Sequence, residues 1–274
     1  MPELPEVEVT RRGIAPALTG CRITAVRARI PALRYPLPAK LGSLLADRRL
    51  EGVHRRGKYL LLNFGAGHLL IHLGMSGSLR LVAADRPAAK HDHLDLVFSG
   101  RDGPVALRLR DPRRFGAVLW LGGDPQQHAL LAPLGIEPLD EAFTADWLEK
   151  ALDGLVAPIK TTLMDSHRIV GIGNIYASES LFRAGIDPRR PAGSISPLRL
   201  GRLVPAIKQT LTAAIAAGGS SLRDFIQSDG SAGYFQQQYF VYGRTGEPCR
   251  NCGRPIRELR QGQRATFYCA RCQR

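Results

Sequence analysis

Four cysteines near the C-terminus have the spacing of a metal site. Cys249 and Cys252 form one Cys-x-x-Cys pair, Cys269 and Cys272 form a second, and 16 residues separate the two pairs. Each pair can place two thiolates on one tight turn, and two such turns complete the tetrahedral set of sulfur ligands that zinc prefers. A redox dithiol or two disulfides are the alternatives, and the paired spacing favours one structural Zn²⁺ over both.

The stretch between the cysteine pairs is rich in arginine. It holds Arg254, Arg257, Arg260 and Arg264, with only Glu258 against them. A segment this short cannot build a core of its own, so a metal would fix a hairpin that presents these side chains. Arginines on such a hairpin indicate contacts to phosphates or to a nucleic-acid groove, although any one of the four could be ordinary surface charge.

The N-terminus could supply a nucleophile. If Met1 is removed, Pro2 exposes a secondary amine. Because α-amino groups have pKa values of about 7.7–8.0, a useful fraction is unprotonated near neutral pH and can attack carbon. Glu3 and Glu6 could move the protons that such chemistry needs. The alternative is that both only complement the dipole of the first helix, which fits Glu6 better than Glu3. Glu8 is expected on the surface.

The charge balance points to a polyanionic partner. The 274 residues include 38 Lys+Arg and 24 Asp+Glu, for a formal net charge of +14. Because like charges repel one another, this surplus favours nucleic-acid binding, with a solvated basic surface as the alternative. No long apolar run is present, which argues against a membrane partner. The acidic N-terminus is unlike a signal peptide, so we expect a cytoplasmic protein.

Several further motifs, in order along the chain, are similar to those of a known family. They are Pro2-Glu3-Leu4-Pro5-Glu6-Val7-Glu8, Gly57-Lys58-Tyr59-Leu60, Ile71-His72-Leu73-Gly74-Met75-Ser76-Gly77, Asp111-Pro112-Arg113-Arg114-Phe115-Gly116 and Gly171-Ile172-Gly173-Asn174-Ile175-Tyr176. With these motifs and the four cysteines, the sequence resembles the bacterial formamidopyrimidine-DNA glycosylases (Fpg, also called MutM). The resemblance runs nearly from end to end.

The resemblance implies an activity and the residues that carry it. It implies a DNA glycosylase and AP lyase of base excision repair that removes oxidised purines (8-oxoguanine and formamidopyrimidines) from double-stranded DNA. Pro2 would form a Schiff base at C1′, and β,δ-elimination would then cleave the strand. Glu3 would be the proton donor, with Glu6 in support. Lys58 and Arg264 would contact phosphates and donate protons in the two eliminations. The family implies a monomer without a small-molecule cofactor.

The resemblance also implies a set of DNA contacts. A base must leave the stack before its C1′ can be attacked, and Met75, Arg113 and Phe115 match the residues that fill the hole it leaves. For Met75 and Phe115 the alternative is ordinary core packing. The remaining contacts would hold the DNA without reading its sequence. They are assigned to Lys160, Asn174, Arg264, Tyr242 and His93, while His72 and His91 are expected to be structural or minor contacts. The glycine-rich segment 228–235 resembles a loop that covers the extruded base.

Two rival interpretations remain. The first is the sister enzyme of the same fold, endonuclease VIII (Nei), which removes oxidised pyrimidines; Leu4 and the Met75, Arg113 and Phe115 set favour the purine enzyme. The second is a DNA-binding zinc-ribbon protein without catalytic activity. It would explain the charge and the cysteines, but it leaves Pro2, Glu3 and Lys58 without a role.

The elements that must position these residues fall into an α+β, multidomain pattern. We expect one helix from Pro5 to about Thr19-Gly20, followed by strands that form an antiparallel β-sandwich. The expected strands cover 22–30, 59–64, 68–72, 78–82, 94–98, 105–109 and 117–121. The domains are expected at 2–135 for the β-sandwich, at 136–228 for a helical domain with a helix–two-turn–helix motif, and at 238–274 for the zinc hairpin.

Helical spacing dominates the later part of the chain. Helices are expected at 144–152, at 175–184 with Asn174 as N-cap, and at 198–217. Pro205 lies inside the last of these, and a proline within a helix removes a hydrogen bond and clashes with the preceding turn. We therefore expect a kink or a break at that residue.

Overall fold

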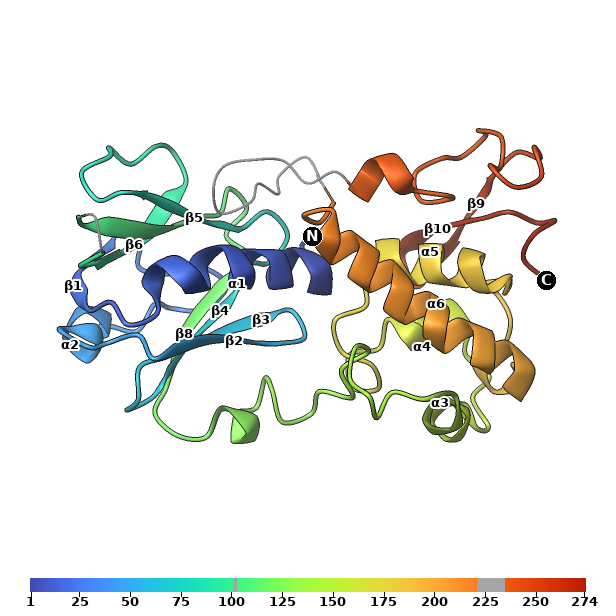
Figure 1. Ribbon diagram of the computed structural model, residues 1–274, viewed down its shortest axis with the longest axis horizontal. Helices are drawn as coiled ribbons and strands as arrows, with labels where there is room; N and C mark the ends of the chain where they lie inside the picture. Colours follow the sequence, from blue (N-terminus) through green and yellow to red (C-terminus); the bar gives the residue numbers. More distant parts are fainter. Residues whose placement is uncertain (101–102, 221–234) are drawn as a thin grey trace. The chain divides into compact units, whose positions relative to one another are not determined.

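The computed structural model of the protein describes residues 1–100, 103–220 and 235–274. The chain divides into two compact units (Figure 1). Unit 1 comprises Met1–Ala132 and the short described stretch 217–220. Unit 2 comprises Pro133–Ala216 and Phe235–Arg274. In the part of the chain that the structure describes, no helix combines the length and the apolar character needed to cross a membrane.

Unit 1 begins with the helix α1, Leu4–Leu18 (Figure 1). Glu3 is its N-cap, a proline stands in the first turn, and the Glu6 side chain bonds back to the N-cap backbone, so the helix has a defined start. Its apolar positions, among them Val7, Ile14 and Leu18, belong to the core of unit 1. The helix ends at Thr19, where the sequence predicts its end.

Two antiparallel four-stranded sheets share the core of unit 1, which confirms the predicted sandwich. One sheet has the order β1-β6-β7-β5 and the other the order β2-β3-β4-β8. The strands are β1 (Ile23–Ala28), β2 (Gly52–Arg56), β3 (Tyr59–Asn63), β4 (His68–His72), β5 (Ser78–Ala83), β6 (Asp92–Phe98), β7 (Val105–Arg110) and β8 (Ala117–Leu121). A short helix, α2 (Leu41–Leu45), and a 3-10 turn, η1 (Pro125–Gln127), complete the unit. The helix α1 packs on β2, β3 and β5.

Unit 2 is helical and ends in a β-hairpin. The helices α5 and α6 pack on each other, α3 packs on α6, and β10 of the hairpin packs on α5. The elements are α3 (Ala145–Leu152), α4 (Ile159–Leu163), α5 (Asn174–Ala184), η2 (Ala192–Ser194), α6 (Pro197–Ala216), η3 (Phe235–Gln238), β9 (Arg257–Gln261) and β10 (Arg264–Tyr268). The predicted helices and the hairpin between the cysteine pairs are therefore present.

Two details of the helices differ from the expectation. Helix α6 is a single helix through Pro205, so a break there was wrong. Pro205 is exposed, and the residue four positions earlier, Gly201, is also exposed with open space around it. Water can therefore reach the Gly201 carbonyl that the proline leaves without a backbone partner. In α5 the N-cap is Gly173, and Asn174 is the first helical residue.

Candidate active site

The N-terminal residues lie at the start of α1, where backbone bonds fix the supporting carboxylate. Pro2 and Glu3 are both buried. Glu6 is fully buried; its Oε2 accepts from the Glu3 N–H at 2.8 Å and its Oε1 from the Ser220 N–H at 2.9 Å. This geometry shows the helix-start role that the sequence left open for Glu6. The Pro2 nitrogen is an amide as long as Met1 is attached and becomes an amine when Met1 is removed.

A hollow of about 390 Å³ adjoins the N-terminus, lined by Met1, Arg34, His72, Gly74, Met75 and Phe115. Met75 is 39% exposed and Phe115 46% exposed, so neither is a core residue. The Arg113 guanidinium carbon lies 4.9 Å from the centre of the Phe115 ring. The structure thus brings together the three side chains that the sequence predicts to replace an extruded base, and it rejects the core alternative for two of them.

Asp111 organises the two turns that carry these side chains, a role that the sequence did not predict. It is fully buried, and its two oxygens accept from the Ser76 hydroxyl and the Gly116 N–H, both at 2.8 Å. The Ser76 hydroxyl in turn accepts from the Arg113 N–H at 3.1 Å. The turn with Gly74 and the turn with Phe115 lie in direct contact. A Cβ added at Gly74 would lie only 2.4 Å from the Phe115 carbonyl carbon, so no side chain fits there. The Asp-Pro pair at the start of a turn was the one local signal for this role.

His93 belongs to the same structural network. Its ring is buried, and its Nε2 lies 2.9 Å from the backbone oxygen of Asp111. This contact holds the backbone of Asp111 in place. The direct DNA contact expected for His93 stays a prediction.

Lys58 lies in the two-residue turn between β2 and β3, close to His72. Gly57 opens the turn with a φ of +56°, a backbone conformation that glycine adopts without strain. Burial, with the nearby charges of Lys58 and Arg34, lowers the pKa of His72 to about 4. The Gly74 N–H donates a hydrogen bond to His72 Nδ1, with 3.3 Å between the two nitrogens. Because Nδ1 accepts, the neutral ring carries its proton on Nε2. His72 therefore offers the hollow a donor without a charge.

Glu8 differs most from its expectation. We expected it on the surface, but it is only 7% exposed. Its carboxylate accepts from Arg11 and Arg12 on the same helix and from Arg55 on β2, at N···O distances from 2.8 to 3.2 Å. Because Arg11 and Arg12 follow Glu8 by three and four residues on one helix, the sequence suggests ion pairs on an exposed helix face. The additional contact from Arg55 on β2 encloses the carboxylate.

Lys160 is a buried anchor within unit 2. It is 1% exposed, and its ammonium donates to Asn174 Oδ1 at 2.5 Å, to the Ala265 carbonyl at 2.8 Å and to the Thr266 hydroxyl at 2.7 Å. These contacts give Lys160 a positioning role within unit 2. The phosphate contact expected for Lys160 stays a prediction. It joins the start of α5 to strand β10, whose first residue is Arg264.

The other three DNA-contact candidates of unit 2, which are Arg264, Tyr242 and Asn174, are partly or fully exposed. Arg264 is exposed at the start of β10, opposite Gln261. Tyr242 is half-buried, with its ring 5.0 Å from that of Phe267, and its N–H donates to Glu179 at 2.8 Å. Asn174 accepts from Lys160 through Oδ1, and it lies at the N-terminus of α5, a position that favours anions.

The four predicted cysteines form one cluster. Cys249 Sγ lies 3.8 Å from Cys272 Sγ, Cys252 Sγ lies 3.5 Å from Cys269 Sγ, and all four sulfurs lie within 4.8 Å of one another. Zinc–sulfur bonds of about 2.3 Å require sulfurs about 3.8 Å apart in a tetrahedron. The geometry fits one structural Zn²⁺ with no position left for a substrate.

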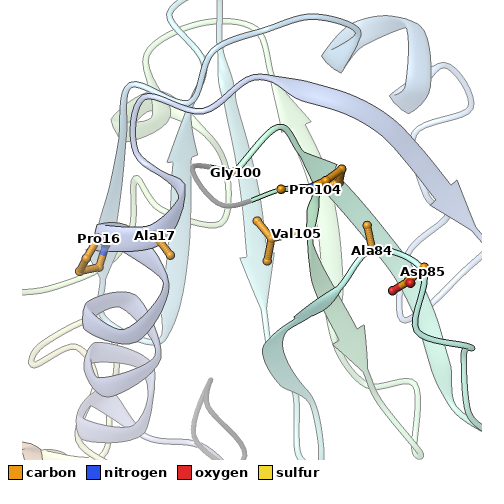
Figure 2. Close-up of a pocket in the computed structure, with 8 residues that line it drawn as sticks. Pro16, Ala17, Ala84, Asp85, Gly100, Pro104 and Val105 are labelled. Atoms are coloured by element: carbon orange, nitrogen blue, oxygen red, sulfur yellow. The ribbon is translucent and has the colours of Figure 1, made fainter.

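A second hollow of unit 1 lies away from these residues. It encloses about 870 Å³ and is lined by Pro16, Ala17, Ala84, Asp85, Gly100, Gly103, Pro104 and Val105 (Figure 2). Pro16 and Ala17 stand near the end of α1 opposite to Pro2, about 20 Å along a helix of this length. Among the described residues that line this hollow, Asp85 is the only ionisable one. We therefore assign no chemistry to the hollow.

Three family models together match most of the chain. Residues 1–118 match the formamidopyrimidine-DNA glycosylase N-terminal domain, and residues 134–226 match the formamidopyrimidine-DNA glycosylase H2TH domain. Residues 246–274 match a zinc finger found in Fpg and IleRS. The chain belongs to the formamidopyrimidine-DNA glycosylase family. The zinc finger match agrees with the cysteine cluster, so the expected structural zinc site is confirmed. The base-covering loop expected at 228–235 lies, except for its last residue, outside the described residues.

Relatives within the Fpg family span the full chain. The chain is 62% identical to the formamidopyrimidine-DNA glycosylase of Aromatoleum aromaticum, over 100% of both proteins. It is 58% identical to that of Methylobacillus flagellatus, over 100% of this chain and 96% of the relative.

Solved structures of Fpg proteins share the fold. The crystal structure of MutM (Fpg) from Thermus thermophilus matches with a TM-score of 0.87 at 39% identity, over 99% of this chain and 98% of that one. A complex of Lactococcus lactis Fpg with DNA containing an abasic site matches with a TM-score of 0.90 at 34% identity, over 99% of each chain. A complex of a Lactococcus lactis Fpg mutant with DNA containing Fapy-dG matches with a TM-score of 0.90 at 33% identity, over 99% of each chain.

Proposed function

We propose that this chain is a DNA glycosylase and AP lyase of base excision repair that removes oxidised purines from double-stranded DNA. The observation that carries the proposal is a hollow that is lined by Met1, the residue before Pro2 and Glu3, and that has exposed Met75 and Phe115 on its rim. The names of its relatives and the lesion-containing DNA in the Lactococcus lactis complexes support the same assignment. The enzyme acts as a cytoplasmic monomer without a small-molecule cofactor.

The proposed chemistry starts after Met1 is removed. The Pro2 amine attacks C1′, the C1′–base bond breaks, and the base leaves with the bonding electrons and takes up a proton. Glu3 protonates the sugar ring oxygen, the ring opens, and an iminium forms between Pro2 and C1′. Loss of a C2′ proton then expels the 3′ phosphate, and a second elimination expels the 5′ phosphate. Lys58 and Arg264 bind these phosphates and donate protons in the two eliminations, while Glu6 holds the start of α1.

The proposed DNA contacts divide into those that replace the base and those that hold the backbone. Met75 and Phe115 enter the gap that the extruded base leaves, and Arg113 bonds to its orphaned partner. Asn174, Tyr242 and Arg264 bind phosphates. We also propose Lys160 and His93 as DNA contacts, in addition to their roles in holding Asn174 and Asp111. We propose the same functional domains that the sequence predicts, namely 2–135 for the β-sandwich, 136–228 for the helical domain and 238–274 for the zinc hairpin.

The deciding experiment uses a duplex with one 8-oxoguanine opposite cytosine. We expect chain processed to Pro2 to leave a one-nucleotide gap, and added borohydride to trap a covalent protein–DNA adduct whose mass analysis places the bond on Pro2. A parallel duplex carrying thymine glycol tests the rival, because faster cleavage of that substrate would reassign the enzyme to oxidised pyrimidines. Zinc-loaded, processed chain that binds DNA and gives neither product would identify a binding protein without catalysis.

Removing the base-replacing side chains should affect base excision more than strand cleavage. Met75→Ala and Phe115→Ala each remove packing that offsets unstacking, about 1–3 kcal/mol, so excision of 8-oxoguanine should fall about 10- to 100-fold. Cleavage of a duplex with an abasic site, which has no base to extrude, should fall much less. The matched control is Leu198→Ala, which truncates an apolar side chain that is 79% exposed in unit 2. Equal losses on both substrates would contradict the assignment.

A further inference from the structure

Glu8 joins the first helix to the strand that leads into the Lys58 turn. Its Oε2 accepts from Arg55 Nε at 3.2 Å, across 47 positions of the sequence, and from Arg11 Nε at 3.0 Å. Its Oε1 accepts from Arg11 and from Arg12, both at 2.8 Å. The Arg55 side chain is 11% exposed and that of Glu8 10%, so the pair is shielded from most of the solvent. A shielded arginine–carboxylate pair restricts both side chains more than an exposed one does.

The second contact of Arg55 reaches the turn itself. Its NH1 donates to the Gly57 carbonyl at 3.0 Å. This carbonyl belongs to the peptide unit whose nitrogen is that of Lys58, so the bond fixes the plane from which the Lys58 side chain starts. Arg56 pairs with Tyr59 at the end of the hairpin, which leaves only Gly57 and Lys58 in the turn. A turn this short has few conformations, and one bond to its carbonyl selects among them.

We propose that Glu8 and Arg55 are positioning residues that hold Lys58 in its working orientation. The inference rests on the proposed function, because it assumes that Lys58 acts on the DNA backbone. In this proposal Glu8 acts through Arg55 and not by contact with the DNA. It fixes the direction of the Arg55 guanidinium, and the guanidinium fixes the Gly57–Lys58 peptide. A phosphate contact from a lysine depends on such placement, because displacement by 1 Å can lower a rate about 100-fold.

The ionisation of Glu8 fits this role. Burial alone raises the pKa of the carboxyl, but the hydrogen bonds and charges of Arg11, Arg12 and Arg55 outweigh it and lower the pKa to about 2. The carboxylate therefore keeps its charge at any pH at which the enzyme would be assayed. Glutamine has the same shape without that charge, and its amide nitrogen cannot accept from an arginine.

The test is a double-mutant cycle between Glu8 and Lys58. On a duplex with an abasic site we expect Glu8→Gln to slow single-turnover strand cleavage about 10-fold while binding of the duplex changes less than about 2-fold. If Glu8 acts through Lys58, adding Glu8→Gln to Lys58→Met should slow cleavage less than about 2-fold further, because the lysine that Glu8 positions is already absent. Two effects that multiply in the double variant would overturn the proposal.

Matched variants separate positioning from folding. Arg12→Gln removes a different partner of Glu8. Arg12 is exposed and lies on α1, not on the strand before the turn, so the Arg12→Gln variant should cleave at the wild-type rate. Arg55→Lys keeps the positive charge but replaces the two guanidinium nitrogens that contact Glu8 and Gly57 by one ammonium on a more flexible chain, so it should repeat the Glu8→Gln defect. It takes the place of Glu8→Gln if that variant does not fold. A normal rate for Arg55→Lys would refute the inference. If the wild type leaves abasic DNA uncut, the proposed function fails. If the wild type cuts it and the effects of Glu8→Gln and Lys58→Met multiply in the double variant, only this inference fails.

Discussion

Replacing Pro2 by glycine is expected to abolish most strand cleavage and to leave DNA binding intact. The change keeps an N-terminal amine but removes the ring. Proline gives a secondary amine whose adduct with C1′ is a permanently charged iminium, whereas glycine gives a primary amine on a flexible chain. Loss of the dedicated nucleophile should slow cleavage of the 8-oxoguanine duplex about 100-fold or more. The measurements are single-turnover cleavage and the yield of the borohydride-trapped adduct.

Two controls make the Pro2 result specific. A preparation in which Met1 is retained has an amide at Pro2 and should give no adduct on this residue, with mass spectrometry reporting the N-terminus. Pro16→Ala changes an exposed proline near the end of α1 and should behave as wild type. An unchanged cleavage rate in a Pro2→Gly protein shown to begin at residue 2 would show that the reaction does not need the proline ring. An unchanged rate in the protein that retains Met1, whose residue 2 nitrogen is an amide, would eliminate that nitrogen as the nucleophile.

The elements that could be predicted are those whose signal is local. The strands β4 and β8 are short apolar runs next to glycine, and their ends agree with the prediction. Strand β2 was missed because it reads Gly-Val-His-Arg-Arg and buries only Val53. Its conformation is decided by pairing with β3, a contact that its own residues do not encode. The zinc cysteines could be predicted because their spacing alone carries the geometry.

The roles that could not be predicted depend on contacts between distant parts of the chain. Only the family resemblance gave Lys160 a role, as a phosphate contact, and its place in a short helix did not indicate its buried contacts. Its partners at Ala265 and Thr266 lie more than 100 positions later. The burial of Glu8 and of Asp111 was also not predictable, because each side chain is enclosed by residues from another part of the chain. Buried polar groups must be paired, but the sequence does not say which partner is chosen.

Removing the zinc should cost the protein most of its affinity for DNA. The cysteines lie in a small core with Phe182, Val241, Ile256 and Phe267, and the two strands of the hairpin are too short to be stable alone. Structural zinc contributes about 10–16 kcal/mol in zinc-finger peptides, so its loss should unfold the hairpin. Arg264 would then lose its place, and the anchor from Lys160 to β10 would open.

We expect Cys269→Ser, which replaces a buried ligand, to lower the zinc content well below one per chain and to weaken binding of an abasic duplex about 100-fold at fixed salt. The slope of the logarithm of the binding constant against the logarithm of the salt concentration should also become less steep. The change is about 0.9 for each phosphate that the variant no longer binds. Cys21→Ser is the matched control, because Cys21 lies in unit 1 and outside the cluster of four, and it should keep both zinc and affinity. Full zinc content with unchanged affinity in Cys269→Ser would show that the hairpin does not depend on the metal. Lost zinc with unchanged affinity would remove Arg264 from the proposed phosphate contacts and leave DNA binding to residues outside the hairpin.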